Sequence, residues 1–397
     1  MDAAKPDWCS LPHFLLQSIS ERFHSRIDIL RFRAVCGDFR ASTPLPPKIT
    51  PLKIPVPVEL NPIDGDHLLL TESTVYAIQP LNGTETWLVK AEETSPGKLL
   101  VFDLFCRLRV KHYLSNRLPS KSLNLLDYRV NEISKRNEFH LVSDDDDKAM
   151  EYSEIEIDGD FKRVVASKCL DKINEDEFAV MAIYKNELIV WRNGDNSWTD
   201  IDFSELDFIC ASWTDIVYQS EKFYVVDRGG FVVIVDSKSL SITEVDDPTT
   251  DFETCYKTVF MKSMEDLFVI NYLFSFNRFG SVEYYVSDTS CIFKIDKEKR
   301  KLVNVNKNAL KDRVFFVGRD CSFSITVKEY LECKENCLYF TLGEAMSGLN
   351  SEVKKLTPDL KYSRLAQQYF IFASQCCFSG ILIFSDSPIQ FTPRLFG

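Results

Sequence analysis

The sequence lacks the short motifs that mark the common enzyme classes. It contains no GxSxG nucleophile turn, no HExxH zinc motif, no GxxxxGK[ST] phosphate loop and no GxGxxG dinucleotide fingerprint. Only five histidines are present, and His67, His112 and His140 are spread through strand-like sequence without a nucleophile beside them. We therefore expect no catalytic residues and no cofactor. Because acidic residues are plentiful, a hydrolase that uses two carboxylates remains the enzyme alternative.

An excess of positive charge and a paired-cysteine metal motif are also missing. The formal net charge is −12, which disfavours a nucleic-acid partner because phosphate binding requires Lys and Arg. The 12 cysteines include no CxxC pair, and Cys333 and Cys337 lack two further ligands nearby, so we predict no metal site. Reduced thiols and the absence of a signal-peptide pattern predict a cytoplasmic or nuclear location.

One stretch, Leu365 to Ser385, has no charged residue at all. Its length approaches that of a membrane-spanning helix. However, it contains Gln, Ser and Gly residues, whose polar groups and backbone are costly in hydrocarbon unless they are packed. We interpret it as two buried strands joined by a turn and expect no membrane association, with a single span as the alternative.

Residues 8–42 have the pattern of short amphipathic helices. Leu15, Leu16, Ile19 and Phe23 recur at the spacing of one helix face. Asp28 stands where it can cap a second helix. The apolar face of that helix would comprise Ile29, Phe32, Val35, Cys36 and Phe39. Helices this short need packing against something else, which is either the rest of the chain or a partner protein.

The next segment, residues 43–57, is rich in proline, which prevents a helix and favours an extended connector. We therefore predict a helical module over 7–42, a linker over 43–57 and one large domain over 58–397, whose part beyond 365 is atypical.

The large domain is predicted to be all-β. Short runs rich in Val, Ile, Phe and Tyr alternate with turn sequences such as Asn82-Gly83 and Gly229-Gly230. A strand–turn–strand pattern returns at intervals near 45 residues (Phe178–Trp191, Ser220–Asp236, Glu265–Ile295). So long a series of strands exceeds a single sandwich and favours a β-propeller, which we predict to have about six to seven blades.

The helical stretch resembles the F-box of plant F-box proteins, whose pattern is W-x-x-LP-x-x-LL-x-x-I followed by D-x-x-RFR-x-VC-x-x-WR. The matching residues are Trp8, Leu11, Pro12, Leu15, Leu16, Ile19, Asp28, Arg31, Phe32, Arg33, Val35, Cys36 and Arg40. Phe39 stands where the family usually has Trp, which keeps an aromatic ring but removes the indole N–H donor.

The remainder resembles the KIB-type β-propeller domain that follows this F-box in plants. The resemblance rests on segments such as Trp87–Lys90, Leu123–Val130, Phe223–Arg228 and Val317–Ser324, and it extends to about Ser363. Beyond that point the sequence departs from the family, which leaves open whether the two chain ends pair and close the ring.

This resemblance implies a non-catalytic subunit of a ubiquitin ligase. The F-box would bind a Skp-type adaptor and, through it, a cullin, while the propeller would bind an unknown protein substrate. The implied adaptor-binding residues are Leu11, Pro12, Leu15, Leu16, Ile19, Ile29, Phe32, Val35, Cys36 and Phe39. The alternative is a ligase-independent regulator that acts by occupying its partner, for example a kinase.

Overall fold

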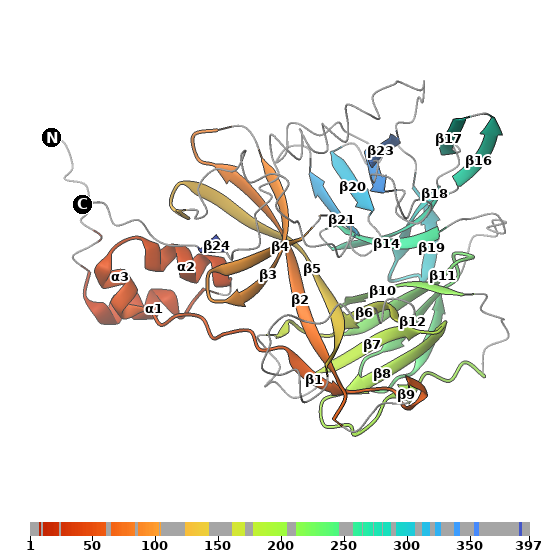
Figure 1. Cartoon of the computed structure of the whole chain (residues 1–397), viewed down its shortest axis with the longest axis horizontal. Helices are drawn as coiled ribbons and strands as arrows, with labels where there is room; N and C mark the ends of the chain where they lie inside the picture. The colour runs from red at the N-terminus through yellow and green to blue at the C-terminus, as the bar shows by residue number, and fades with distance from the viewer. Residues whose placement is uncertain are drawn as a thin grey trace. The chain divides into compact units, whose positions relative to one another are not determined.

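The computed structural model describes residues 8, 11–23, 25–60, 65–83, 86–102, 104, 124–142, 161–170, 178–204, 212–245, 257–263, 265–272, 274–279, 281–286, 291–305, 312–317, 322–326, 337–341, 353–356 and 389–390. The chain forms two compact units. One comprises Met1–Thr50, Thr74–Ser134 and Ile371–Gly397, and the other comprises Pro51–Ser73 and Lys135–Phe370. The architecture is mainly β with short N-terminal helices, as predicted (Figure 1).

Three short helices open the first unit: α1 (His13–Ser20), α2 (Arg26–Ala34) and α3 (Gly37–Ser42). Pro12 occupies the N-cap of α1, where its missing N–H is not needed. The predicted capping role of Asp28 is wrong, because α2 starts at Arg26 with Ser25 as its N-cap. Asp28 instead lies in the first turn of α2, where its charge suits the helix dipole and Arg31 pairs with it at 2.9 Å.

The sheet of the first unit is built from strands that are distant in sequence. β2 (His67–Pro80), β3 (Trp87–Ser95), β4 (Lys98–Phe102) and β24 (Ile389–Gln390) follow one another in it, and β5 (Tyr128–Val142) pairs with β2. In the β4–β24 pair Ile389 lies opposite Leu99. Strands from the two ends of the β body therefore share one sheet, which is the pairing expected of a propeller.

The Pro-rich segment is more than a linker, because it contains β1 (Leu52–Pro55), which pairs with the first part of β2 in the second unit. Pro55 ends this strand at the edge of its sheet, where a missing N–H donor is tolerated. A 3-10 turn, η2 (Val58–Leu60), follows. Two short apolar runs in the sequence, His67–Thr71 and Val75–Ile78, predict two separate strands, but the structure has the single strand β2 across both.

The second unit contains four-stranded sheets that follow one another along the chain. Two of them are the antiparallel meanders β6 (Phe161–Ala166), β7 (Ala179–Tyr184), β8 (Glu187–Arg192), β9 (Thr199–Asp200) and β10 (Trp213–Gln219), β11 (Lys222–Asp227), β12 (Val232–Asp236), β13 (Ile242–Val245). Tight turns join their strands, and in two of these turns both central residues have positive φ (Lys185–Asn186 and Ser220–Glu221).

Two further four-stranded sheets belong to the second unit. One contains β14 (Lys257–Ser263), β15 (Asp266–Tyr272), β18 (Cys291–Asp296) and β19 (Lys301–Asn304), with the hairpin β16 (Phe274–Phe279) and β17 (Ser281–Val286) inserted between its second and third strands. The other is formed by β20 (Arg313–Val317), β21 (Ser322–Thr326), β22 (Cys337–Thr341) and β23 (Val353–Leu356), in the order β21-β20-β22-β23 with β20 and β22 parallel. This last sheet departs from the simple meander of the others.

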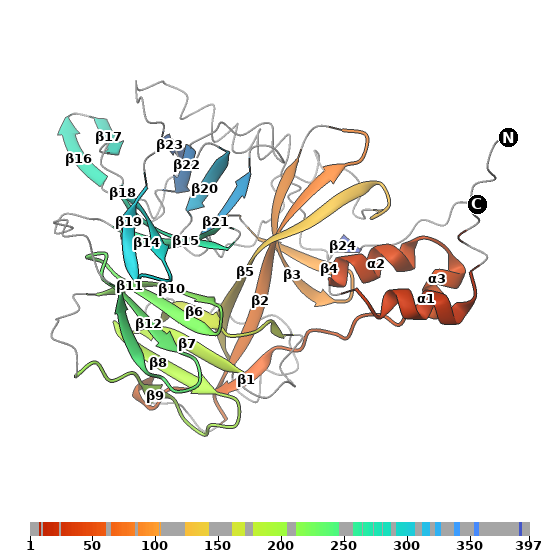
Figure 2. The same ribbon diagram turned by 180° about the vertical axis from the view of Figure 1, so that it is seen from behind.

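The first strands of successive sheets are joined by polar contacts. Asp215 on β10 accepts Arg163 of β6 at 2.5 Å and the backbone N–H of Phe260 on β14 at 2.8 Å. Ser324 on β21 donates to the carbonyl of Lys262 on β14. Strands β6, β10, β14 and β21 therefore lie side by side in the order in which their sheets follow along the chain (Figure 2). This is the arrangement expected of successive propeller blades.

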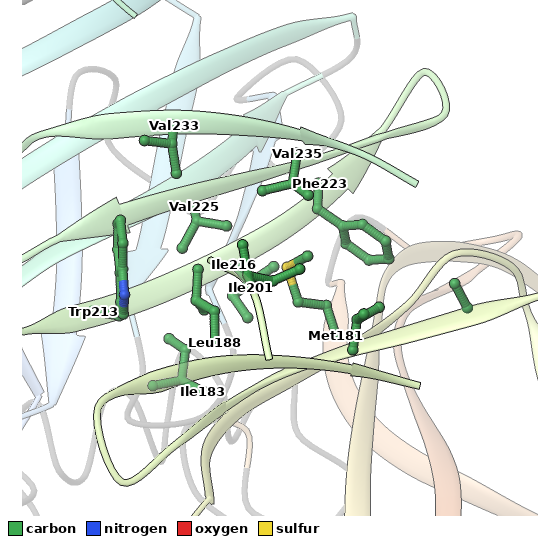
Figure 3. Packing of buried hydrophobic residues seen from close by; sticks show 12 residues of the cluster. Met181, Ile183, Leu188, Ile201, Trp213, Ile216, Phe223, Val225, Val233 and Val235 are labelled. Atoms are coloured by element: carbon green, nitrogen blue, oxygen red, sulfur yellow. The ribbon is translucent and has the colours of Figure 1, made fainter. Parts of the chain in front are cut away.

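Apolar side chains fill the space between adjacent sheets. Figure 3 shows Met181, Ile183 and Leu188 from one sheet packed against Phe223 and Val225 from the next. This face-to-face packing explains why the strands at the centre of these sheets are apolar on both faces, as in the fully buried β7.

Some predictions fall outside the described residues. These are the two strands proposed within Leu365–Ser385, the surroundings of Cys333, and the number of blades, which stays a prediction of six to seven. None of the helices in the described ranges has the length and apolar character needed to cross a membrane.

Candidate docking surface of the N-terminal helices

The three N-terminal helices have a small core of their own. Leu16 of α1 is completely buried, and Phe39 of α3 is 6% exposed. The ring of Phe32 on α2 lies between those of Phe23 and Phe39, with centroid distances of 5.2 and 4.6 Å. Such aromatic contacts explain how helices of six to nine residues persist, since none is long enough to be stable alone.

Polar contacts fix the same helices to one another. Ser42 at the end of α3 contacts His13 Nδ1 at the start of α1, at 2.6 Å. Arg33 of α2 donates to the carbonyl oxygens of Arg40 and Thr43. Burial, with a contribution from nearby Arg40, lowers the pKa of the Arg33 guanidinium, which nevertheless stays charged at neutral pH. These contacts hold α3 against α1 and α2.

The ten predicted adaptor-binding residues separate into three groups by exposure. Pro12, Leu15, Ile19 and Val35 are exposed, and Leu11, Ile29, Phe32 and Cys36 are partly buried. Leu16 and Phe39 lie in the helical core. In the free chain these two side chains therefore have almost no exposed surface. The role of all ten residues in adaptor binding stays a prediction.

We call the exposed group of apolar residues the docking face; it comprises Pro12, Leu15, Ile19 and Val35. The exposed fractions of its three larger side chains are 40% for Leu15, 38% for Ile19 and 42% for Val35. Phe14 (67% exposed) and Trp8 (62%) add further apolar surface at the same end of the chain. Phe14 is absent from the motif that directed the prediction, so the sequence pattern did not identify it.

Helix α2 has a second apolar side, which the sequence prediction missed. Ile27, Leu30 and Ala34 are buried and recur at i, i+3 and i+7. Ile27 and Leu30 belong to an apolar cluster with residues of the sheet and of the turn before β5 in the same unit. Those residues are Tyr76, Ile78, Val89, Ala91, Leu99, Val101, Leu125 and Val130. Figure 1 shows α2 next to this sheet. One side of α2 thus packs on the chain, which confirms the first of the two alternatives from the sequence. Packing of the exposed side on a partner stays a prediction.

A buried ion pair accompanies this packing. Arg26 Nε donates to Glu93 Oε2 at 2.7 Å, and the two side chains are only 11% and 9% exposed. The other carboxylate oxygen of Glu93 accepts the backbone N–H of Gly97, in the turn between β3 and β4, at 2.8 Å. Glu93 therefore links the start of α2 to a specific turn of the sheet.

The docking face is suited to hydrophobic association with another protein. Within the described ranges no group of three or more His, Cys, Asp or Glu side chains is arranged to hold a metal ion. Exposed Leu, Ile and Val side chains on two short helices are the usual anchors of a helix-mediated contact. The chemistry that this surface supports is burial of apolar area.

Comparison with known proteins agrees with this architecture. The model of the KIB1-4 beta-propeller family matches residues 65–372, which is most of the chain. The chain belongs to the KIB1-4 β-propeller family. The start of the match follows the helices and the Pro-rich segment, so the family domain corresponds to the predicted β body.

Relatives of this KIB1-4 propeller are F-box proteins of Arabidopsis thaliana. The chain is 26% identical to F-box protein SKIP23 over 369 residues, which cover 86% of this chain and 85% of that protein. It is 26% identical to F-box protein At4g35733 over 349 residues, covering 84% and 88%. It is 23% identical to F-box protein At2g17036 over 344 residues, covering 82% and 80%. Each of these relatives is named an F-box protein, and each match covers at least 80% of its length.

Proposed function

We propose that this KIB1-4 propeller is a substrate-recognition subunit of a Skp-cullin-F-box ubiquitin ligase. In this role α1–α3 bind a Skp-type adaptor through the docking face, and the propeller binds a protein substrate. The chain makes and breaks no covalent bond itself. It acts by raising the concentration of the substrate near the ubiquitin-transferring enzyme. This role places the protein in the cytoplasm or the nucleus.

The observation that carries the proposal is the exposed docking face on helices that have their own core. Full burial of a large apolar side chain stabilises a complex by about 1.5–3 kcal/mol. Because Leu15, Ile19 and Val35 are each about two-fifths exposed, burying the remainder supplies about 0.6–1.2 kcal/mol each. Together they supply about 2–3.5 kcal/mol, which corresponds to about a 30- to 300-fold change in affinity.

The names of the relatives support the same role. Each of the three relatives described above is called an F-box protein, and the matches cover 86%, 84% and 82% of this chain. The identity of the substrate is a separate question, because propellers of one family bind different partners through their loops.

Affinity purification of the full-length chain from plant cells tests the proposal. We expect the adaptor and cullin to co-purify in stoichiometric amounts and the purified complex to transfer ubiquitin to a bound protein. Recovery of a bound protein without adaptor or cullin would contradict the ligase role and favour a regulator that acts by occupancy. Loss of a hydrolytic activity on substitution of propeller carboxylates would instead favour an enzyme.

A further inference from the structure

The two opposite sides of helix α2 make different contacts. Successive residues of an α-helix are 100° apart, so Ile27 and Leu30 lie on a different side from Ile29 and Phe32. The first pair packs into the cluster of the first sheet, whereas Phe32 of the second pair contacts the rings of Phe23 and of Phe39 on α3. A single helix thus contacts the propeller sheet on one side and the proposed adaptor-binding module on the other.

We infer that α2 fixes the docking helices to the first sheet, so that the two behave as one rigid folding unit rather than as a module on a flexible tether. Without this contact, the Pro-rich segment after Ser42 would be the only connection between the helices and β2. The buried side of α2, which we call the α2 seam, consists of Arg26, Ile27 and Leu30 packed on Glu93 and the sheet cluster.

The apolar part of the α2 seam supplies the cohesion. Ile27 is 4% exposed and Leu30 is 9% exposed, although both belong to a helix near the end of the chain. Separating α2 from the sheet would expose these two side chains and, at the same time, strand residues such as Val89 and Val101. Separation therefore exposes apolar surface on both α2 and the sheet, and this free-energy cost makes the two unfold cooperatively.

The ionic part of the α2 seam supplies the orientation. A buried ion pair contributes little net stability compared with apolar packing, because both charges lose their hydration. Its geometric requirement is strict, however, since separation leaves one charge buried without compensation. Glu93 accepts from Arg26 Nε with one oxygen and from the Gly97 N–H with the other, so the position of α2 is tied to the β3–β4 turn.

The consequence for the proposed ligase role is geometric. An adaptor bound to the docking face would be held in one orientation relative to the first sheet. A rigid connection sets a single effective concentration of a bound substrate near the transferring enzyme, whereas a flexible tether averages over many orientations. This consequence rests on the proposed function. The rigid unit itself is a property of the free chain and holds with or without an adaptor.

Hydrogen exchange followed by mass spectrometry on the full-length chain tests the inference. The test variant is Glu93→Gln, which keeps the shape of the side chain but removes the charge that pairs with Arg26. We expect amide exchange to accelerate at least tenfold both in α2 and in the β3–β4 turn that contains Gly97. Acceleration confined to the turn, with α2 unchanged, would show that the helices are held independently of the sheet and would overturn the inference.

Two further variants make the result interpretable. Asp28→Asn removes the exposed ion pair within α2 and leaves the α2 seam intact, so exchange in the β3–β4 turn should stay unchanged. Leu30→Val is a milder change in the apolar part, for use if Glu93→Gln does not fold, and it should accelerate exchange in α2 and in the turn together. Neither outcome depends on adaptor binding, so failure here is distinguishable from failure of the ligase proposal.

Discussion

Leu15 and Leu16 are neighbours in α1, yet the structure predicts opposite consequences for their substitution. Leu16 is completely buried, whereas Leu15 is 40% exposed. Leu→Ala removes three carbon atoms, worth about 2.4 kcal/mol when fully buried. For Leu16→Ala the cavity adds to this loss, giving about 3–4 kcal/mol. For Leu15→Ala only the buried three-fifths counts and no cavity forms, giving about 1.4 kcal/mol.

Urea unfolding of both variants, followed by circular dichroism, measures these free energies at constant m-value. Leu16→Ala should lower the midpoint two to three times as much as Leu15→Ala, while Leu15→Ala should weaken adaptor binding more than its stability loss explains. Equal destabilisation by the two variants would refute the assignment of Leu16 to the helical core. The pair also shows why Leu15→Asp combined with Leu16→Asp is a poor test of docking, because the second change alone would unfold the helices.

Two predictions concern the propeller. Asp215→Asn should lower the free energy of unfolding by about 3–5 kcal/mol, since it removes the carboxylate charge that compensates Arg163. Glu244→Gln, at an exposed position, is the control. A loss below about 1 kcal/mol in Asp215→Asn would contradict the role of Asp215. Backbone N–H donors lower the pKa of Asp236 (Ser239 and Lys238) and of Asp296 (mainly Lys299). The stability that these carboxylates contribute is therefore present above their unfolded pKa near 3.9 and lost as the pH falls through the lowered folded pKa. Asp236→Asn with Asp296→Asn should flatten the decline of the thermal midpoint between pH 5 and pH 2, and an unaltered pH profile would refute the assignment.

The strand pattern was predictable wherever strands are apolar and separated by turn residues. Such apolar runs predict strands at Leu188–Trp191, Phe223–Asp227 and Leu267–Tyr272, and these coincide with β8, β11 and β15 to within one residue at each end. β5 escaped prediction because charged and polar residues interrupt its apolar positions. β2 was divided in two because Thr71–Thr74 reads as a polar turn, although these residues are buried within one strand. Polar residues buried in a long strand carry no local signal of their burial.

The candidate site was predictable as a motif but not as a surface. Periodicity predicted that Leu15, Leu16 and Ile19 lie on one side of a helix. In the structure Leu15 and Ile19 are exposed, whereas Leu16, which is 100° from Leu15 around the helix axis, is buried. It could not separate Leu16 from Leu15, because which of them is buried depends on how the helices pack together. The inward side of α2 was also missed, since Ile27 and Leu30 are recognised only once strands about 50 to 100 residues away pack against them.

The central claim is that the docking face binds a Skp-type adaptor, and calorimetric titration of the purified chain with purified adaptor tests it most directly. The variant Leu15→Asp with Ile19→Asp changes only exposed positions, and Leu81→Asp, on the 58%-exposed Leu81, is the matched control. We predict that the double variant stays folded and loses at least 30-fold in affinity, while Leu81→Asp binds like the unmodified protein. Unchanged affinity of the folded double variant would contradict the account.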